Sequence, residues 1–294
     1  MSDADLGRSL VSSRRRFSVE WGALTHKGLV RVTNEDCFFV GRFDRMLQPM
    51  LTNLPESTSR IWHYDAGYAV VIADGMGGEV AGEIASHTAV STLIDLAVET
   101  PDWIMRYDDP SLVAEVTRRM DERVRRVDEL IQAIGKSQPK LAGMGTTLTA
   151  LALLPPRALV AHVGDSRAYV VRDGRLRQIT RDHTVVQELL DAGLIEPREA
   201  ARHPARNVLT SAAGHGGGSL AVDVHPVDVR GGDQFLLCTD GLSGLVGDAD
   251  IQGVLLAEES AATACKTLID LALARGGSDN VTAVLGRVTE ERSS

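Results

Sequence analysis

The chain has 294 residues, of which 44% are hydrophobic and 24% are charged, a composition typical of a globular protein with one large domain or two small ones. Its 40 Asp and Glu outnumber its 31 Lys and Arg, so the net charge of −9 argues against a surface for nucleic acid or anionic membranes, which would need a basic stripe. Three widely spaced cysteines without a Cys-x-x-Cys pair, and no run of ~18 apolar residues, predict a cytoplasmic protein with reduced thiols and no membrane insertion.

The first part of the chain is predicted to place three strands before two helices. The strands are expected over residues 17–25, 37–41 and 67–73. Between the last two, residues 42–66 carry Pro, Asn, Ser and Thr and predict an irregular excursion, which is either a contact for a partner or substrate or a passive insertion. Residues 80–99 and 113–134 predict helices, because their apolar residues recur every three or four positions.

From residue 145 onward the pattern changes to that of β-strands. The strands are expected over residues 145–154, 158–164, 168–172, 220–229, 234–239 and 280–288. Asp173-Gly174 is a typical hairpin turn, residues 182–213 mix two short helices with loop, and residues 260–275 predict another amphipathic helix. This order does not follow a regular βαβ alternation, and it therefore favours an antiparallel α+β layer fold.

Four short acidic motifs are spread over the chain. They read Arg31-Val32-Thr33-Asn34-Glu35-Asp36, Ala73-Asp74-Gly75-Met76-Gly77-Gly78, Cys238-Thr239-Asp240-Gly241 and Ser278-Asp279-Asn280. Three of them place Asp at or just beyond the end of an apolar run. Carboxylates gathered at the ends of buried strands are costly unless a cation neutralises them, so the motifs predict one divalent-metal site assembled from distant segments. The Arg of the first motif adds a phosphate ligand.

Together and in order, these motifs and several others resemble the type 2C metal-dependent Ser/Thr protein phosphatases, in their compact bacterial form. The other motifs are Thr25-His26-Lys27-Gly28, Gly82-x-x-Ala85-Ser86, Gly145-Thr146-Thr147-Leu148, His162-Val163-Gly164-Asp165-Ser166-Arg167 and Gly277-Ser278-Asp279-Asn280-Val281-Thr282. Each motif alone is weak evidence, because Asp-Gly is a common turn. The resemblance implies a four-layer α-β-β-α sandwich with two central antiparallel sheets.

The resemblance also divides the chain. It covers about residues 17–288 as one phosphatase domain, in which residues 182–213 match a flap region beside the active site. Residues 1–16 are expected to be a flexible N-terminal tail, because they are polar and lack the apolar core of a signal peptide; a docking arm is the alternative. Residues 289–294 are expected to be a C-terminal tail.

The resemblance implies two tight sites for Mn²⁺ or Mg²⁺. The carboxylate of Asp74 would bridge the two ions, and the carbonyl of Gly75 would bind one of them. Asp240 and Asp279 would complete the first site, and Glu35 would reach the second. Oxygen ligands of this kind suit hard divalent cations. For Asp74, the alternative is an Asx turn without metal.

Arg31, Asp36 and Asp74 are the catalytic residues that the resemblance implies. The Arg31 guanidinium can engage two phosphate oxygens at once, whereas its alternative is a surface ion pair. Asp36 would orient metal-bound water, with Asn280 in a supporting role. The alternative for Glu35-Asp36 is a solvated turn.

Three further positions are more ambiguous. By resemblance Asp165 helps to hold a third, weaker metal ion, but a hydrogen-bonding role in a turn is the alternative. Met76 stands where many eukaryotic members carry a His proposed to protonate the leaving group, and Met cannot donate a proton. His183 could replace it only if residues 182–213 fold over the site; otherwise it is a loop or capping residue.

The resemblance implies hydrolysis of phosphoserine and phosphothreonine on proteins by in-line attack of a dimetal-bound water. The expected partners are phosphorylated proteins, including a Ser/Thr protein kinase and its substrates, and the expected state is a monomer. One alternative is a catalytically silent phosphatase fold that binds a kinase or regulator. Another is an enzyme that acts on small phosphorylated metabolites.

Overall fold

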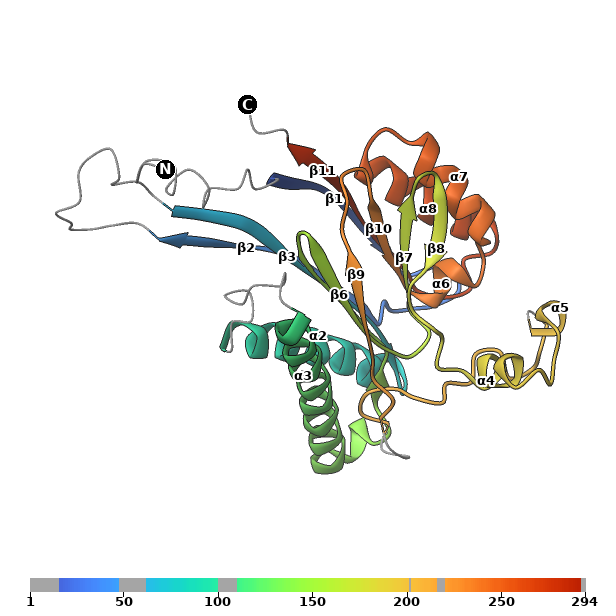
Figure 1. Ribbon diagram of the computed structural model, residues 1–294. Coiled ribbons are helices and arrows are strands. Elements are labelled where there is room, and N and C mark those ends of the chain that lie inside the picture. Colours follow the sequence, from blue (N-terminus) through green and yellow to red (C-terminus); the bar gives the residue numbers. More distant parts are fainter. Residues whose placement is uncertain (1–15, 48–61, 100–109, 201, 216–219, 292–294) are drawn as a thin grey trace, which may run out of the picture.

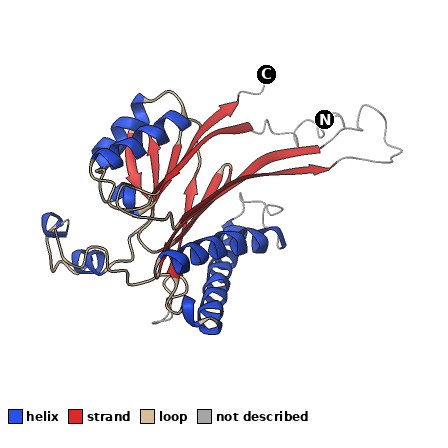
Figure 2. Ribbon diagram, turned by 180° about the vertical axis from the view of Figure 1, so that it is seen from behind, coloured by secondary structure: helices blue, strands red, loops and turns tan. Residues whose placement is uncertain are grey.

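The computed structural model describes residues 16–47, 62–99, 110–200, 202–215 and 220–291. Two antiparallel sheets lie face to face, and helices cover the outer face of each (Figure 1). Seen from behind, the two layers of strands are flanked by helices on opposite sides (Figure 2). The predicted α-β-β-α sandwich is therefore confirmed.

The first sheet has six strands in the order β2-β3-β5-β6-β9, with the short β4 added to β3. Its strands are β2 (Asp36–Leu47), β3 (Trp62–Met76), β4 (Gly145–Thr146), β5 (Leu148–Leu154), β6 (Arg157–Val163) and β9 (Asp223–Asp228). Helices α2 (Glu79–Glu99) and α3 (Pro110–Ser137) cover its outer face, where Val71 and Leu148 of the sheet pack with Ala85 and Val124 of the helices. Apolar residues at helical spacing produce this face.

The second sheet has five strands in the order β1-β11-β10-β7-β8. Its strands are β1 (Arg16–His26), β7 (Arg167–Arg172), β8 (Arg175–Gln178), β10 (Gln234–Cys238) and β11 (Val281–Glu291). Helices α7 (Asp248–Ala257) and α8 (Ala261–Ala274) pack on its outer face through residues such as Ile251 and Leu268. Between the sheets, Ile72 and Val160 meet Leu237 and Val284 in a third apolar cluster.

The remaining elements are short. They are the 3₁₀ helix η2 (Pro139–Leu141) and the helices α4 (Val185–Asp191), α5 (Pro197–Ala200) and α6 (Asp240–Ser243). Helices α4 and α5 form the projecting lobe at the right of Figure 1. Thr184 caps α4 by accepting a hydrogen bond from the Gln187 amide, which satisfies one of the free donors of the first turn.

Several expected boundaries were wrong. Strands β2 and β3 continue through residues 42–47 and 62–66, so the predicted excursion is regular sheet at both ends; residues 48–61 lie outside the described residues. The register shifts between Phe43 and Arg45, which interrupts the alternation that a sequence pattern needs. At the other end β11 runs through Glu291, so residues 289–291 are strand and not tail. The expected N-terminal tail lies outside the described residues, except for Arg16 at the start of β1.

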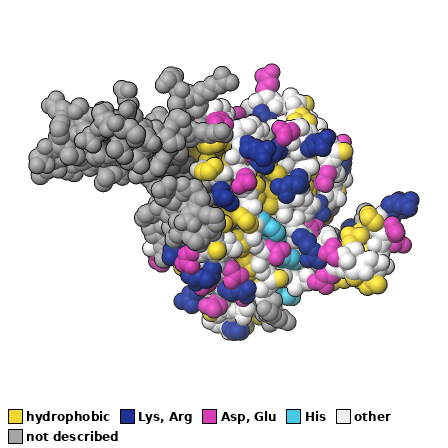
Figure 3. All heavy atoms as spheres, viewed as in Figure 1, with side chains coloured by type: hydrophobic (Ala, Val, Ile, Leu, Met, Phe, Trp, Pro, Cys, Tyr) yellow, Lys and Arg dark blue, Asp and Glu magenta, His cyan; other side chains and the backbone are white. Residues whose placement is uncertain are grey.

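On the face in Figure 3, Lys and Arg side chains are interspersed with Asp and Glu, and the lobe of α4 and α5 stands out from the body. Among the described helices, none combines the length and apolar character needed to cross a lipid bilayer.

Candidate active site

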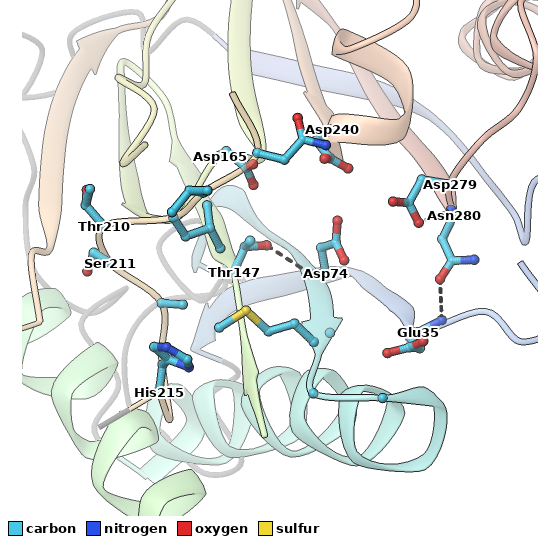
Figure 4. A pocket seen from close by; sticks show the side chains of 18 of the residues that line it. Glu35, Asp74, Thr147, Asp165, Thr210, Ser211, His215, Asp240, Asp279 and Asn280 are labelled. Carbon is cyan, nitrogen blue, oxygen red and sulfur yellow. Dashed lines mark hydrogen bonds between the residues drawn. The ribbon is translucent and has the colours of Figure 1, made fainter. Parts of the chain in front are cut away.

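A cavity of about 760 Å³ lies at one end of the two sheets. Carboxylates that are far apart in the sequence line it: Glu35, Asp74, Asp165, Asp240 and Asp279. In Figure 4 Asp74 lies near the centre, Asp165 and Asp240 lie above it, and Asp279 and Glu35 lie to one side. Thr210, Ser211 and His215 come from the opposite wall (Figure 4).

The ends of strands place these side chains. Asp74 lies near the end of β3, directly opposite Asp36 of β2, and its amide donates to the Thr147 hydroxyl over 3.0 Å. Asp240 begins α6 immediately after β10, whereas Asp279 lies two residues before β11. Each sheet therefore contributes carboxylates to a single cavity between their ends.

Asp36 lies beneath the cavity and joins the two sheets. Its Oδ2 atom accepts hydrogen bonds from the hydroxyls of Thr239 (2.9 Å) and Thr282 (2.6 Å). Thr239 and Thr282 also pair with each other through the Thr282 amide and the Thr239 hydroxyl, at 3.0 Å. Both threonines belong to the motifs given above, which predict no role for them. In the sequence, each threonine is recognisable only as a hydroxyl residue beside a predicted ligand motif. The fold shows that both hydroxyls face the carboxylate of Asp36.

Asn280 fixes the segment that carries Glu35. Its Oδ1 accepts from the Glu35 amide at 2.7 Å, as the dashed line in Figure 4 shows. Its Nδ2 donates to the carbonyls of Lys27 (2.9 Å) and Thr33 (2.8 Å). Because Asn280 is almost fully buried, loss of its amide would leave several backbone groups unpaired.

Arg31 lies at the rim of the cavity. One of its terminal nitrogens is 2.7 Å from Oδ2 of Asp279, and this hydrogen bond raises the pKa of the guanidinium. Half of the Arg31 side chain remains exposed, at 51%, so the guanidinium is accessible to a ligand entering the cavity.

Two glycines allow the backbone of the Asp74 motif to approach helix α2. A Cβ atom on Gly75 would lie 2.1 Å from the Gly82 carbonyl oxygen, and a Cβ atom on Gly82 would lie 1.8 Å from a carboxylate oxygen of Glu35. The Gly75 amide also donates to the Glu35 carbonyl at 3.2 Å. Glu35, Gly75 and Gly82 are therefore packed together as one unit at the cavity floor.

The carboxylates of this site are strongly perturbed. Burial raises the pKa of Asp36 to about 7, and burial together with the nearby Asp240 raises that of Asp165 to about 8. Burial and repulsion by Asp36 hold the pKa of Asp74 well above its usual range. Burial and the charge of Asp279 raise the pKa of Asp240 to about 6, although a hydrogen bond with Asp74 opposes part of this rise.

These residues fit a divalent cation. The Oδ1 atoms of Asp36 and Asp240 are buried and have no hydrogen-bond partner among the described residues. Oxygen donors that lack partners and repel one another are the donor set that Mn²⁺ and Mg²⁺ prefer. Among the described residues, no three His, Cys, Asp or Glu side chains lie close enough together to hold a metal ion in their present positions.

The segment 207–215 forms the wall opposite Glu35. It is held by a two-way hydrogen bond between Thr146 and Ala213, with both N···O distances at 2.9 Å. His215 ends this wall and was not singled out from the sequence, since nothing in its local pattern marks it. A second cavity of about 320 Å³ adjoins the first and shares Asp165 and Asp240 with it.

His183 is not among the residues that line the main cavity. Its Nδ1 accepts from the Gly164 amide at 3.2 Å, and its Nε2 lies 3.2 Å from Oδ2 of Asp223. It therefore connects the start of the predicted flap to the turn that carries Asp165. Residues 207–212 of the flap do line the cavity, so the flap contributes its last part to the site and not its first.

Comparison with known proteins identifies the family of this chain. A family model described as protein phosphatase 2C matches residues 57–276. The chain belongs to the protein phosphatase 2C family. The resemblance read from the motifs is thereby confirmed.

Two bacterial members of the family illustrate the similarity. The serine/threonine protein phosphatase PstP of Mycobacterium tuberculosis is 38% identical over 283 residues, which are 95% of this chain and 46% of that protein. The serine/threonine phosphatase stp of Listeria welshimeri is 36% identical over 216 residues, 74% of this chain and 82% of that protein. This chain thus spans about half the length of PstP and most of stp.

Solved structures of family members give the same result. The crystal structure of PstP from Mycobacterium tuberculosis superposes with a TM-score of 0.73 at 35% identity, and covers 93% of this chain and 99% of that one. The PstP catalytic domain in complex with two manganese ions gives a TM-score of 0.72 at 34% identity, with the same coverage.

Proposed function

We propose that this protein is a metal-dependent protein phosphatase that hydrolyses phosphoserine and phosphothreonine. The observation that carries the proposal is the gathering of buried, mutually repelling carboxylates from both sheets around one cavity with Arg31 at its rim. Without a cation, this arrangement of carboxylates destabilises the folded protein. With a cation bound, it supplies the positive charge that phosphoryl transfer needs around the transferring group.

The metal-holding residues are proposed to be Glu35, Asp74, Asp240 and Asp279, together with the carbonyl of Gly75. When bound there, two Mn²⁺ or Mg²⁺ ions acidify water and neutralise charge on the phosphoryl group. The crystal structure of the PstP catalytic domain with two manganese ions supports this choice of metal. Asp165 would assist a third, weaker ion, since it reaches the same cavity from the other side of Asp74.

The remaining residues act through position and charge. Arg31 binds the phosphate and can exchange its contact with Asp279 for two phosphate oxygens, because a guanidinium offers several donors in one plane. Asp36 lies opposite Asp74 on the neighbouring strand, and its unpartnered Oδ1 can accept a hydrogen bond from water, which suits a group that orients water. Asn280 holds Glu35 in place through the amide contact described above.

The substrate class rests on the relatives and on the shape of the site. PstP and stp are named as serine/threonine phosphatases, and both Arg31 and the flap segment 207–212 line the cavity. We infer that phosphorylated proteins, including a Ser/Thr protein kinase and its substrates, bind at this cavity. A cytoplasmic location fits the three free cysteines. The monomeric state stays a prediction from the resemblance.

The decisive experiment is phosphate release from a phosphothreonine peptide with Mn²⁺, with Mg²⁺ and with EDTA, alongside the Asp240→Asn variant. Release that requires metal and is lost in the variant is the expected result. Sugar phosphates and nucleotides serve as competing substrates, and faster turnover of these would favour a metabolite phosphatase. A folded, metal-loaded protein that releases no phosphate from peptides or aryl phosphates would favour the silent binding module.

A further inference from the structure

The loop that carries Arg31 exposes an unusual amount of apolar surface. The side chains of Leu29, Val30 and Val32 are 65%, 68% and 72% exposed. Single exposed apolar residues are ordinary in soluble proteins, but three that flank a cavity-lining residue in the sequence are a candidate binding surface. We call the three side chains the apolar ledge.

The ledge is presented by a fixed backbone. Asn280 Nδ2 holds both ends of the loop through the carbonyls of Lys27 and Thr33, and the Leu29 amide donates to the Gly277 carbonyl at 2.7 Å. Gly28 has φ +79°, and a Cβ atom there would lie 2.2 Å from the Asp279 carbonyl oxygen. The loop therefore cannot fold its apolar side chains inward without breaking these contacts. A surface that is ordered in advance loses little conformational entropy on binding.

The ledge adjoins the proposed phosphate-binding residue in the sequence, and its own three side chains are not among those that line the cavity. Arg31 stands between Val30 and Val32, lines the cavity and reaches Asp279 within it. A phosphoresidue whose phosphate contacts Arg31 has its chain neighbours within one or two residues of the ledge, because an extended chain advances about 3.3–3.6 Å per residue. The occupant of the ledge is therefore the segment that carries the phosphate.

The flap segment lines the cavity with both polar residues (Asn207, Thr210, Ser211) and apolar ones (Val208, Leu209, Ala212). The ledge lies on the loop that carries Arg31, and its three exposed side chains are all apolar. Any preference that the ledge supplies therefore concerns apolar residues that flank a phosphorylated side chain.

We propose that the apolar ledge is a specificity site, which accepts an apolar side chain immediately next to the phosphoserine or phosphothreonine of the substrate. This inference rests on the proposed phosphatase function and adds the preferred local sequence of its substrates. Burial of the flanking side chain against Leu29, Val30 and Val32 supplies the preference, because apolar contact area removed from water stabilises the complex.

The test uses two phosphothreonine peptides that differ only in the residues flanking the phosphothreonine, Leu in one and Asn in the other. The ratio of their kcat/KM values is measured for the wild-type protein with Mn²⁺. We expect the Leu peptide to be favoured by roughly tenfold, the discrimination typical of a modest apolar contact. A ratio near one would overturn the proposal.

Two variants locate the preference. In the double variant Val30→Ser, Val32→Ser the ratio should fall to about two or less, since most of the ledge is removed. The matched control is Val98→Ser near the end of α2, where an equally exposed valine (64%) is replaced away from the cavity, and its ratio should remain that of the wild type. An unchanged ratio in the double variant would place the preference elsewhere and overturn the proposal.

A binding measurement separates this inference from the phosphatase activity. The affinities of the same two peptides for the wild-type protein are compared by fluorescence polarisation in EDTA, where no turnover is expected. Tighter binding of the Leu peptide, lost in the double variant, supports the ledge whether or not either peptide is hydrolysed. Equal binding of the two peptides, together with equal turnover, would contradict the ledge as a specificity site without contradicting the phosphatase function. Absence of hydrolysis of both peptides and of p-nitrophenyl phosphate with Mn²⁺ instead contradicts the phosphatase function.

Discussion

Acidic residues occur in two very different surroundings in this protein, the cavity and helix α3. On α3, Glu115 contacts Arg118 and Arg119, and these bonds lower its pKa to about 2. Asp121 pairs with Arg125 in the same manner, one turn away. In the cavity, burial and neighbouring carboxylates have the opposite effect and raise the pKa of Asp165 to about 8.

The opposite pKa shifts indicate different roles for the acidic residues of α3 and those of the cavity. The acids of α3 are neutralised by arginines three or four residues away, so they need no other partner and do little beyond keeping the helix surface polar. The cavity carboxylates are held together by both sheets without enough cations of their own. The fold maintains this unfavourable arrangement, and a bound divalent cation would relieve it.

The strongest test of this contrast is Asp240→Asn. We expect phosphatase turnover to fall by about 10³-fold or more, because a metal-holding oxygen is lost. In EDTA the same variant should melt at the wild-type temperature or above it, because one of several repelling carboxylates is removed. Turnover is measured with the phosphothreonine peptide and melting by calorimetry. Retained turnover, or a melting temperature several degrees lower in EDTA, would contradict the proposed difference between the cavity carboxylates and the ion-paired acids of α3.

Arg31→Ala should have the next largest effect. The variant loses the phosphate contact at the rim, so KM should rise by roughly tenfold while kcat changes less. Arg31→Lys should recover only part of this loss, because an ammonium cannot engage two phosphate oxygens side by side. The measurement is steady-state kinetics at saturating Mn²⁺, and an unchanged KM in Arg31→Ala would move the phosphate site elsewhere.

The metal-free protein should lose stability as the pH rises from 6.5 to 8.5. Folding raises the pKa of Asp36 to about 7 and that of Asp165 to about 8, so the folded state binds more protons than the unfolded state below these values. Stability is therefore present at low pH and is lost as the pH rises through the folded pKa values. Below pH 6.5 the buried His162, with a pKa lowered to about 3, opposes this trend, which sets the lower limit of the test.

Thermal melting in EDTA measures this dependence, and melting with saturating Mn²⁺ is the control. With the metal bound, the downward slope should disappear, because the carboxylates then stay ionised at low cost. A flat or rising melting temperature between pH 6.5 and 8.5 in EDTA would show that the cavity carboxylates do not repel one another as the structure indicates.

The smallest effect is expected on α3. Glu115→Gln removes an exposed pair with Arg118 and Arg119, and exposed ion pairs of this kind contribute little, so the melting temperature should stay within about 1 °C of the wild type. Phosphatase turnover should not change. A loss of turnover comparable with that of Asp240→Asn would contradict the proposed difference between the acidic residues of the cavity and those of α3.

The sequence predicted much of the fold because its patterns are local. The apolar spacing of α3 and the turn at Asp173-Gly174 were read correctly; Asp173 has φ +51° and Gly174 +72°, as the hairpin requires. Helices α6 and α7 were not predicted. Helix α6 has only four residues, and α7 has too mixed a pattern for apolar periodicity to reveal it. The extension of β2 was missed because a register shift interrupts its alternation near Phe43.

The sequence by itself indicated the carboxylates that line the cavity, because the ligand motifs are short and each lies at the end of a predicted strand or just before one. Their roles in catalysis stay predictions. Only the tertiary structure showed that Thr239 and Thr282 share Asp36, that Asn280 ties down both ends of the Arg31 loop, and that His183 bonds to Gly164 and Asp223 and not into the cavity. Local patterns specify strands, helices and turns, whereas contacts between residues more than 200 positions apart depend on how the two sheets stack.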